Sequence, residues 1–388
     1  MRRTLRLLAV AALSLMFTRT ASADERGDFV LTLGSDTTSV EHYVRGKDRL
    51  DVDQVGRSPR VLRRKFTYQY KDGSLAKFSM VVTPPGADTP TQMIDATRDG
   101  DSLRIKTQTG TAAPVNSAIA FPAGTLLVPL SSPWAVYEGE VQRFGRSKAD
   151  SLGGRVLYLG ASNLERYLIR PIGPDSVSFW SSRGDLFHIR VDKAGHLIGS
   201  RPITGTFQVA LSRPNTLDMD DLASGYRARE QAGASLGILS PRDTVRAMLA
   251  GGGSLVLDYG RPAKRGRVVF GGLVPYGEVW RTGANAATQL RVDRPLEIGG
   301  TAVPAGFYTI WTIPGASGWK FVLNSETGQW GTAHKADRDL FSTDMKLSTL
   351  PQAVERFTIT VEDLSTGGTL HMDWDTTRAS IEFIVKQP

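Results

Sequence analysis

The chain has 388 residues, no cysteine and a formal net charge of +8. The absence of cysteine excludes disulfides, thiolate metal ligands, a cysteine nucleophile and a lipoprotein anchor, and the length predicts about two domains. Four of the 47 basic residues precede residue 24, and the remaining ones exceed the 39 acidic residues by only four. This near balance excludes an electrostatic nucleic-acid-binding surface.

The first 23 residues have the three parts of a secretory signal peptide. Arginines stand at positions 2, 3 and 6, an apolar run covers residues 7–17, and small residues occupy positions 21 to 23. The run is shorter than the roughly 20 residues that a membrane-spanning helix needs. The basic start and the small residues favour a cleaved signal over a buried N-terminal helix. We expect cleavage after Ala23 and a periplasmic or secreted mature protein without a membrane anchor.

Residues 24–211 have the pattern of short strands separated by turns, with one helix. Residues 63–70 alternate polar and aromatic side chains, which is typical of an antiparallel strand with one buried face. Residues 134–144 break this pattern, because apolar residues recur there at helical spacing after a Ser-Pro start. The apolar face of the predicted helix consists of Trp134, Val136, Tyr137, Val141 and Phe144. We predict an N-terminal antiparallel β domain in which a curled sheet packs on one helix.

Residues 212–239 form the predicted linker between two domains. Asp218 precedes a polar, alanine-rich segment that ends near Gln231, and the residues after it are mostly small. The acidic start favours a short helix, and the small residues favour a flexible connection. Residues 240–388 contain about eight short strands without helical spacing, and we predict a C-terminal β-sandwich domain.

No constellation in the sequence supplies a catalytic or metal site. Gly233, Ser235 and Gly237 match the G-x-S-x-G pattern of hydrolase nucleophiles, but they lie in the linker rather than between a strand and a helix. The five histidines form no pair at metal-ligand spacing. We therefore predict no catalytic residue, no metal ligand and no cofactor.

The densest group of chemically versatile side chains lies in the loops of the predicted sandwich. Three arginines, a carboxamide and two indoles gather in glycine-rich segments, where the backbone can approach a ligand closely and an indole can stack on a sugar ring. In the alternative, arginines tie the loop to Asp258 or Glu278, the asparagine caps a turn, and the indoles pin the loop onto the sandwich. The predicted ligand-binding residues are Tyr259, Arg261, Arg267, Trp280, Arg281, Asn285 and Trp330.

A series of short motifs runs through the same part of the chain, from residue 240 to about residue 385. They are Tyr259-Gly-Arg-Pro, Gly266-Arg, Phe270-Gly-Gly-Leu-Val-Pro-Tyr-Gly, Val279-Trp-Arg-Thr-Gly-Ala-Asn, Pro304-Ala-Gly with Tyr308, Trp319 with Asn324, Trp330-Gly and Trp374. Together they resemble the family called domain of unknown function 2911. The resemblance implies an exported bacterial protein with a β-sandwich domain, and it implies no catalytic residues because the family has no established activity. The N-terminal pattern is similar to periplasmic lipid-carrier folds, which is an analogy of fold alone.

These observations favour binding over catalysis. We expect a non-catalytic module for a glycan or other small molecule, a small anionic ligand or an envelope partner, because no histidine cluster or carboxylate pair supplies an acid–base couple. One alternative is a hydrolase acting on cell-envelope material, which two carboxylates facing each other across a pocket would favour. Another is a carrier of a hydrophobic ligand through the N-terminal sheet, which an apolar cavity would favour. The sequence leaves the oligomeric state open.

Overall fold

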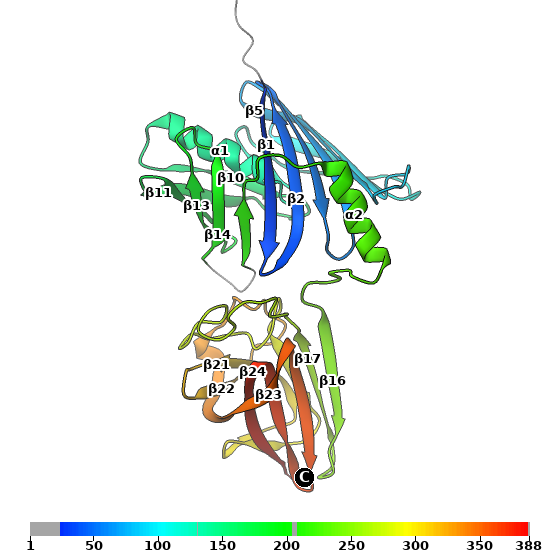
Figure 1. Cartoon of the computed structure of the whole chain (residues 1–388). Helices are drawn as coiled ribbons and strands as arrows, with labels where there is room; N and C mark the ends of the chain where they lie inside the picture. Colours follow the sequence, from blue (N-terminus) through cyan, green and yellow to red (C-terminus); the bar gives the residue numbers. More distant parts are fainter. Residues whose placement is uncertain (1–23, 130, 204–207, 387–388) are drawn as a thin grey trace, which may run out of the picture.

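The computed structural model describes residues 24–129, 131–203 and 208–386. The predicted signal peptide lies outside these residues. Among the residues described, no helix is long and apolar enough to cross a membrane. The chain is mainly β, as expected, and its strands form two sheets that follow one another in sequence. Figure 1 shows the N-terminal sheet, coloured blue to green, above the C-terminal sheet, coloured green to red.

The N-terminal sheet has 15 strands and is antiparallel except for β9 and β10, which run parallel. The predicted alternation in residues 63–70 is confirmed in β4, where Phe66 and Tyr68 are buried and Lys65 and Gln69 are exposed. The strands are β1 (Glu25–Leu33), β2 (Asp36–Arg45), β3 (Arg49–Gly56), β4 (Leu62–Lys71), β5 (Ser74–Thr83), β6 (Gln92–Asp99), β7 (Ser102–Thr109), β8 (Val115–Ala120), β9 (Leu126–Val128), β10 (Leu152–Tyr158), β11 (Glu165–Gly173), β12 (Ser176–Ser181), β13 (Leu186–Val191), β14 (Leu197–Pro202) and β15 (Val209–Ser212). The first strand pairs with both β2 and β15.

Helix α1 (Trp134–Ser147) packs against the curled N-terminal sheet (Figure 1). The predicted helix is confirmed, since all five residues of its predicted apolar face are buried. On one side, the ring of Tyr137 lies 5.0 Å from that of Phe179 in β12. On the other side, Glu138 accepts a hydrogen bond from Tyr43 in β2. Because one helix contacts strands from both halves of the sheet, the sheet curls around it.

Helix α2 (Met219–Gln231) follows the last strand of the N-terminal sheet. Asp218 caps it by accepting hydrogen bonds from two backbone N–H groups of the first turn. The predicted short helix is therefore present, and it is packed rather than free. Its residues Met219 and Tyr226 form a small core with Val40 and Val55, so β2 and β3 are covered on the face opposite to α1.

The C-terminal sheet has nine strands in the order β16-β17-β18-β21-β22-β23-β24-β19-β20. Its two long strands change register where they bend, which brings distant parts of the sheet face to face. Tyr259 in β17 thus packs edge-on against Phe357 in β23, with ring centroids 5.8 Å apart, and the two layers enclose one core. The elements are β16 (Arg242–Met248), β17 (Ser254–Gly260), β18 (Thr288–Val292), β19 (Leu296–Ile298), β20 (Thr301–Val303), β21 (Gly306–Ile313), β22 (Trp319–Asn324), the short helix η1 (Ala336–Arg338), β23 (Asp339–Leu364) and β24 (Gly367–Val385).

The turn between β1 and β2 contacts a loop of the C-terminal sheet. The backbone N–H of Ser35 donates to the carbonyl of Arg265 at 3.1 Å, and the guanidinium of Arg265 pairs with Asp36. Gly34 has a positive φ of 61°, and a Cβ atom there would overlap the Arg265 carbonyl. Glycine at this position therefore permits the close approach of the two sheets.

Candidate functional site

The arginines predicted to bind a ligand hold loops of the C-terminal sheet together. Arg261 donates to Asp243 (3.0 Å), to the Phe357 carbonyl (3.2 Å) and to the Thr358 hydroxyl (2.9 Å). Arg267 donates to two carbonyls of its own turn, at 2.9 and 2.6 Å. These bonds resemble the alternative role of tying the loop, although the partners are not the expected Asp258 or Glu278.

Arg281 and Tyr259 are also inside the C-terminal sheet. Arg281 is buried, which lowers the pKa of its guanidinium. It packs so closely under Gly331 that a Cβ atom there would overlap its side chain. Tyr259 is fully buried, and its hydroxyl accepts a hydrogen bond from the backbone N–H of Ile359 at 3.0 Å.

The two predicted tryptophans differ in environment. Trp280 is 5% exposed and packs with Phe357 at 5.0 Å and Trp374 at 5.9 Å between ring centroids, as in the alternative of a pinned loop. Trp330 is 58% exposed. The N–H of Gly331, which follows it, donates to the carbonyl of Asn285, whose side chain is also exposed. Of the seven predicted residues, Trp330 and Asn285 present the most side-chain surface to solvent.

A second polar cluster, which is not among the predicted site residues, lies between α1 and the N-terminal sheet. It begins at Glu41 of β2, which caps α1 in place of Pro133. The buried Glu41 carboxylate accepts hydrogen bonds from the backbone N–H groups of Trp134 and Ala135, each at 2.9 Å. These are two of the four donors that a helix start leaves unpaired. Burial raises the pKa of Glu41 to about 7, against the opposing effect of hydrogen bonds from Ala135, Trp134 and Gln54.

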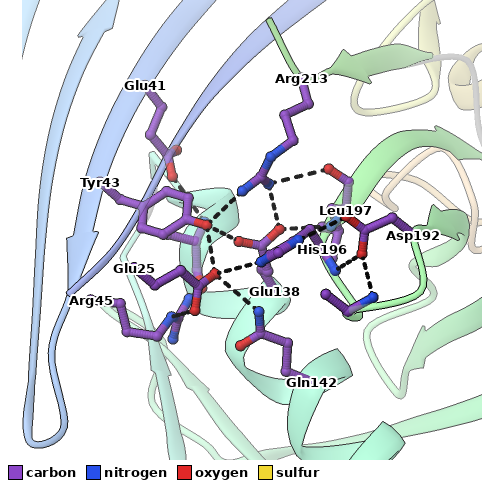
Figure 2. Close-up of polar contacts among 12 residues, drawn as sticks. Glu25, Glu41, Tyr43, Arg45, Glu138, Gln142, Asp192, His196, Leu197 and Arg213 are labelled. Atoms are coloured by element: carbon purple, nitrogen blue, oxygen red, sulfur yellow. Dashed lines mark hydrogen bonds and ion pairs between the residues drawn. The ribbon is translucent and has the colours of Figure 1, made fainter. Parts of the chain in front are cut away.

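Glu138, one turn into α1, is the centre of the cluster (Figure 2). Its fully buried carboxylate accepts hydrogen bonds from the hydroxyl of Tyr43, from the Leu197 N–H at 2.6 Å and from Arg213 at 2.6 Å. Arg213 also donates to the Tyr43 hydroxyl at 2.8 Å. A Cβ atom at Gly27 would lie 2.4 Å from Nη2 of Arg213 and 2.6 Å from the ring of Tyr43, which is too close for either side chain to keep its position.

The cluster continues to the surface through Glu25 (Figure 2). The Glu25 carboxylate lies 2.9 Å from the Tyr43 hydroxyl, accepts a hydrogen bond from Gln142 at 3.0 Å, and lies 3.5 Å from Nε2 of His196. Nδ1 of His196 is 2.8 Å from Asp192. Each carboxylate of this cluster thus has a polar side chain beside it. The cluster holds α1 against β1, β2 and β14.

A cavity of about 180 Å³ adjoins this cluster on the other side of α1. We call it the Arg45 cavity. Two of its lining residues, Tyr68 and Arg45, each carry one buried polar atom without a hydrogen-bond partner in the part of the chain that the structure describes, namely the Tyr68 hydroxyl and Nε of Arg45, and both atoms are shielded from the cavity itself. The cavity is lined by Arg45, Tyr68, Tyr70, Gly73, Ser74, Leu75, Gly124, Thr125, Leu126, Leu127, Val136, Gly139, Glu140 and Arg143.

Two features fix the guanidinium groups of the Arg45 cavity. Arg45 donates from Nη2 to the carbonyl of Ala135 at 2.5 Å and lies close to Gly139, where a Cβ atom would be 2.5 Å from its Nη1. Arg143 donates from Nε and Nη2 to Oε2 of Glu140, at 3.0 and 2.5 Å, and from Nη2 to the hydroxyl of Tyr167 at 2.7 Å. The glycine on α1 therefore gives Arg45 room to lie against the helix.

A wider hollow of about 940 Å³ lies over β6, β7 and β8. Its wall consists of exposed side chains of strands at the end of the sheet, and two of them, Arg104 and Asp99, form an ion pair at 2.5 Å. This hollow is therefore the solvent-exposed face of three strands rather than an enclosed site. The Arg45 cavity is the better candidate, since charged and phenolic side chains from β2, β4 and α1 converge on it.

One local signal for the buried cluster is present in the sequence. Glu138 follows Trp134 by four residues and precedes Val141 by three, so it stands on the apolar face of the predicted helix. A carboxylate at such a position needs a buried partner. The sequence does not specify the partner, because Arg213 and Tyr43 come from distant segments.

Residues 240–383 match the model of a family described as protein of unknown function, DUF2911. This match confirms the family resemblance of the C-terminal sheet. No curated protein matches the chain. Among solved structures, a beta-barrel-like protein of domain of unknown function DUF1849 from Brucella abortus has 10% sequence identity and a TM-score of 0.34. The similarity covers 50% of this chain and 96% of that chain.

Proposed function

We propose that this protein is a non-catalytic binding protein that holds a small polar ligand in the Arg45 cavity. The observation that carries the proposal is the composition of the cavity wall, in which the guanidinium groups of Arg45 and Arg143 and the carboxylate of Glu140 surround a volume of about 180 Å³. Convergent polar groups in the wall of a cavity are the usual means of fixing a small ligand.

The size and the wall of the cavity favour a small polar ligand over a hydrophobic one. At roughly 30 Å³ for each water molecule, the volume of about 180 Å³ corresponds to about six waters. Pockets for larger ligands measure about 300–1,000 Å³ and are mostly apolar. The wall here contains two guanidinium groups, two phenols and a carboxylate, which does not favour the carrier of a hydrophobic ligand.

The hydrolase alternative receives little support from the same wall. Glu140 is the carboxylate that lines the cavity, and its Oε2 accepts hydrogen bonds from Arg143 and Tyr167. Hydrolysis by a carboxylate pair needs a second acid or base facing the first. Glu41 and Glu138 are instead held by the start of α1 and by Arg213.

A second candidate function is contact with a glycan through the C-terminal sheet. The observation in its favour is Trp330, a large aromatic side chain that is 58% exposed beside the loop of Asn285. An exposed indole can stack on a sugar ring. Trp330→Ala should then abolish retention on immobilised peptidoglycan or polysaccharide without lowering the melting temperature, and unchanged retention would contradict this role.

We further propose that the chain is exported to the periplasm or beyond. The support is its N-terminal sequence, with arginines at positions 2, 3 and 6 and the apolar run of residues 7–17. Mass spectrometry of the protein from periplasmic and culture fractions should give an N-terminus at residue 24. A mature protein that retains Met1 would contradict export by a cleaved signal.

The cavity proposal is tested with a matched pair of substitutions in α1. Thermal shift of the full chain is measured against a panel of monosaccharides, sugar acids, amino acids, dicarboxylates and inorganic phosphate. Gly139→Ala should remove the shift given by any member that binds in the cavity, because the added methyl displaces Arg45. Gly145→Ala should preserve the shift, because a Cβ atom there meets nothing within 4 Å.

The pair separates an effect on the cavity from a general effect on the helix. Both variants replace glycine by alanine within α1, and alanine is the better helix former by about 1 kcal/mol. If Gly139→Ala fails to fold, Arg45→Met takes its place, since it removes one guanidinium of the cavity wall. The proposal is wrong if no panel member shifts the melting temperature, or if all shifts survive both cavity variants.

A further inference from the structure

The face of β10 to β14 that points away from α1 carries an excess of positive charge. These five strands are consecutive neighbours in the N-terminal sheet (Figure 1). Phe179 of β12 and Phe187 of β13 contact the rings of Tyr137 and Trp134 in α1. Successive side chains of a strand point to opposite faces, so the residues that alternate with these phenylalanines point outward. We call the outward surface the arginine face, after its residues Arg155, Arg166, Arg170, Arg190 and Arg201.

No acidic side chain occupies an outward position of these five strands, where glycine, serine, histidine and apolar residues accompany the arginines. Within the described residues, Arg190 is the one arginine of this face with a carboxylate within reach, and that carboxylate, of Asp175, is 4.0 Å away in the turn before β12. After residue 23 the basic residues of the chain exceed the acidic ones by only four. The arginine face is therefore a local concentration of charge in a nearly balanced protein.

The outward face at the other end of the same sheet has a different arrangement of charge. There, Asp95 of β6 stands opposite Lys106 of β7 in the strand register, and opposite charges in such positions attract. On the arginine face, Arg155 of β10 stands opposite Arg166 of β11, and like charges in such positions repel. An anion bound between the two guanidinium groups would turn this repulsion into attraction.

A row of apolar side chains crosses the arginine face. In the strand register, Leu168 of β11 lies opposite Trp180 of β12, and Trp180 lies opposite Leu186 of β13. The N–H of Ile203, just after β14, donates to the Leu186 carbonyl at 2.8 Å. Trp180 is 39% exposed and Ile203 is 37% exposed. Since neighbouring strands lie about 4.8 Å apart, the row is about 14 Å long.

Arginines stand on both sides of this apolar row. On β11, Arg166 comes two residues before Leu168 and Arg170 comes two residues after it. On the other edge of the row, Arg201 comes two residues before Ile203. Aromatic and aliphatic side chains flanked by basic ones are typical of protein surfaces that lie in the interface of a membrane. The indole of a tryptophan takes its place among the headgroups, and guanidinium groups bind phosphate in a bidentate manner.

We propose that the arginine face binds the surface of a bilayer that contains anionic phospholipid. The guanidinium groups contact the lipid phosphates, and the row around Trp180 enters the headgroup layer. The aliphatic side chains of the row favour lipid over an anionic polysaccharide, because a sugar ring stacks on an indole but not on leucine or isoleucine. This contact is peripheral and needs no membrane anchor. It is independent of the proposed ligand in the Arg45 cavity.

Vesicle flotation tests the proposal. The protein used is the chain from residue 24 to residue 388, so that the apolar run of residues 7–17 cannot itself bind lipid. Vesicles of phosphatidylglycerol and phosphatidylethanolamine are compared with vesicles of phosphatidylcholine, at low and at high sodium chloride concentration. We expect flotation with the anionic vesicles and a loss of flotation at high salt, because salt screens the attraction. No flotation with the anionic vesicles, or equal flotation with both kinds, would overturn the proposal.

Variants locate the contact on the arginine face. Arg170→Gln and Arg201→Gln should each lower the partition coefficient about fivefold, since a basic residue near an anionic membrane contributes about 1 kcal/mol. Trp180→Ser should also lower it severalfold. The matched controls are Arg104→Gln on β7 and Phe307→Ala on β21, which remove an exposed arginine and an exposed aromatic ring from other surfaces. The controls should leave the partition coefficient unchanged.

An anionic polysaccharide is the rival partner of this face. Retention of the same protein on immobilised alginate, without flotation on anionic vesicles, would assign the face to a polysaccharide and overturn the lipid surface. If the three variants of the arginine face keep the melting temperature and float like the wild type, the contact lies elsewhere and the proposal is wrong. None of these outcomes bears on the Arg45 cavity, which is tested with soluble ligands.

Discussion

Glu41 makes the stability of the N-terminal sheet depend on pH in a direction unusual for a carboxylate. Burial raises the pKa of Glu41 to about 7 from an ordinary value of 4.5. The folded chain therefore holds a proton that the unfolded chain releases between these two values. Stability falls with rising pH wherever the folded state binds more protons than the unfolded state. This group should make the sheet less stable at pH 8 than at pH 5.5.

The magnitude follows from the two pKa values. Their difference corresponds to about 3 kcal/mol in full, at about 1.4 kcal/mol for each pH unit. Since titration is incomplete at the ends of the range, about 2 kcal/mol of this appears between pH 8 and pH 5.5. In Glu41→Gln the side chain is neutral throughout. The loss of stability caused by this substitution should therefore be about 2 kcal/mol larger at pH 5.5 than at pH 8.

The assay is urea unfolding of the full chain at the two pH values. Hydrogen–deuterium exchange of peptides from α1 separates the N-terminal sheet from the C-terminal one. Comparing the variant with the wild type at each pH cancels the pH dependence that the two proteins share. Asp101→Asn, at an exposed site, is the control. A loss of stability in Glu41→Gln that is equal at both pH values would refute the reasoning.

Three further predictions follow from other contacts. Glu138→Ala and Arg213→Met should each lower the stability of the N-terminal sheet by about 3–5 kcal/mol in urea unfolding, because each leaves a buried charge without its partner. The double variant should lose less than the sum, and additive losses would argue against direct pairing. Gly34→Ala should loosen the contact with Arg265 and raise the radius of gyration in X-ray scattering; an unchanged radius would show that this turn does not hold the sheets together. Limited proteolysis should cut first within residues 232–239, since the helix before them is packed on the sheet, and a first cut inside α2 would contradict that packing.

The sequence predicted α1 well because its signal is local. Apolar residues at helical spacing are determined by one short segment, and the structure buries all of them. The cap of the same helix was beyond prediction. Pro133 offers no capping side chain, and the partner of the first turn is Glu41, which lies more than ninety residues earlier in the chain. Contacts of this kind depend on the whole fold.

The predicted binding residues of the C-terminal sheet show the same limit. Trp280 and Trp330 both stand in glycine-rich segments beside polar residues. Trp280 is in the core, where it packs against Phe357 and Trp374, and Trp330 is exposed. The composition of a loop indicates which groups are available for binding, but the path of the loop decides which of them reach solvent.

The Arg45 cavity could not be predicted for a related reason. Its wall combines β2, β4, the start of β5, β9 with the residues before it, and one face of α1. In the sequence, Arg45 and Tyr68 resemble the polar and apolar positions of ordinary strands. The feature that distinguishes them is that the folded chain brings both to the wall of one cavity.

The pairing of β1 with β15 has a consequence for biosynthesis. Val30 of the first strand lies opposite Ser212 of the last, so one side of β1 has no final partner until almost the whole sheet has been translated. Contacts between such distant segments form slowly, and an unpaired strand edge is a template for association with other chains. A nascent chain that ends before residue 209 should therefore expose the unpaired edge of β1 to other chains. The few residues of β15 are enough to cover that edge.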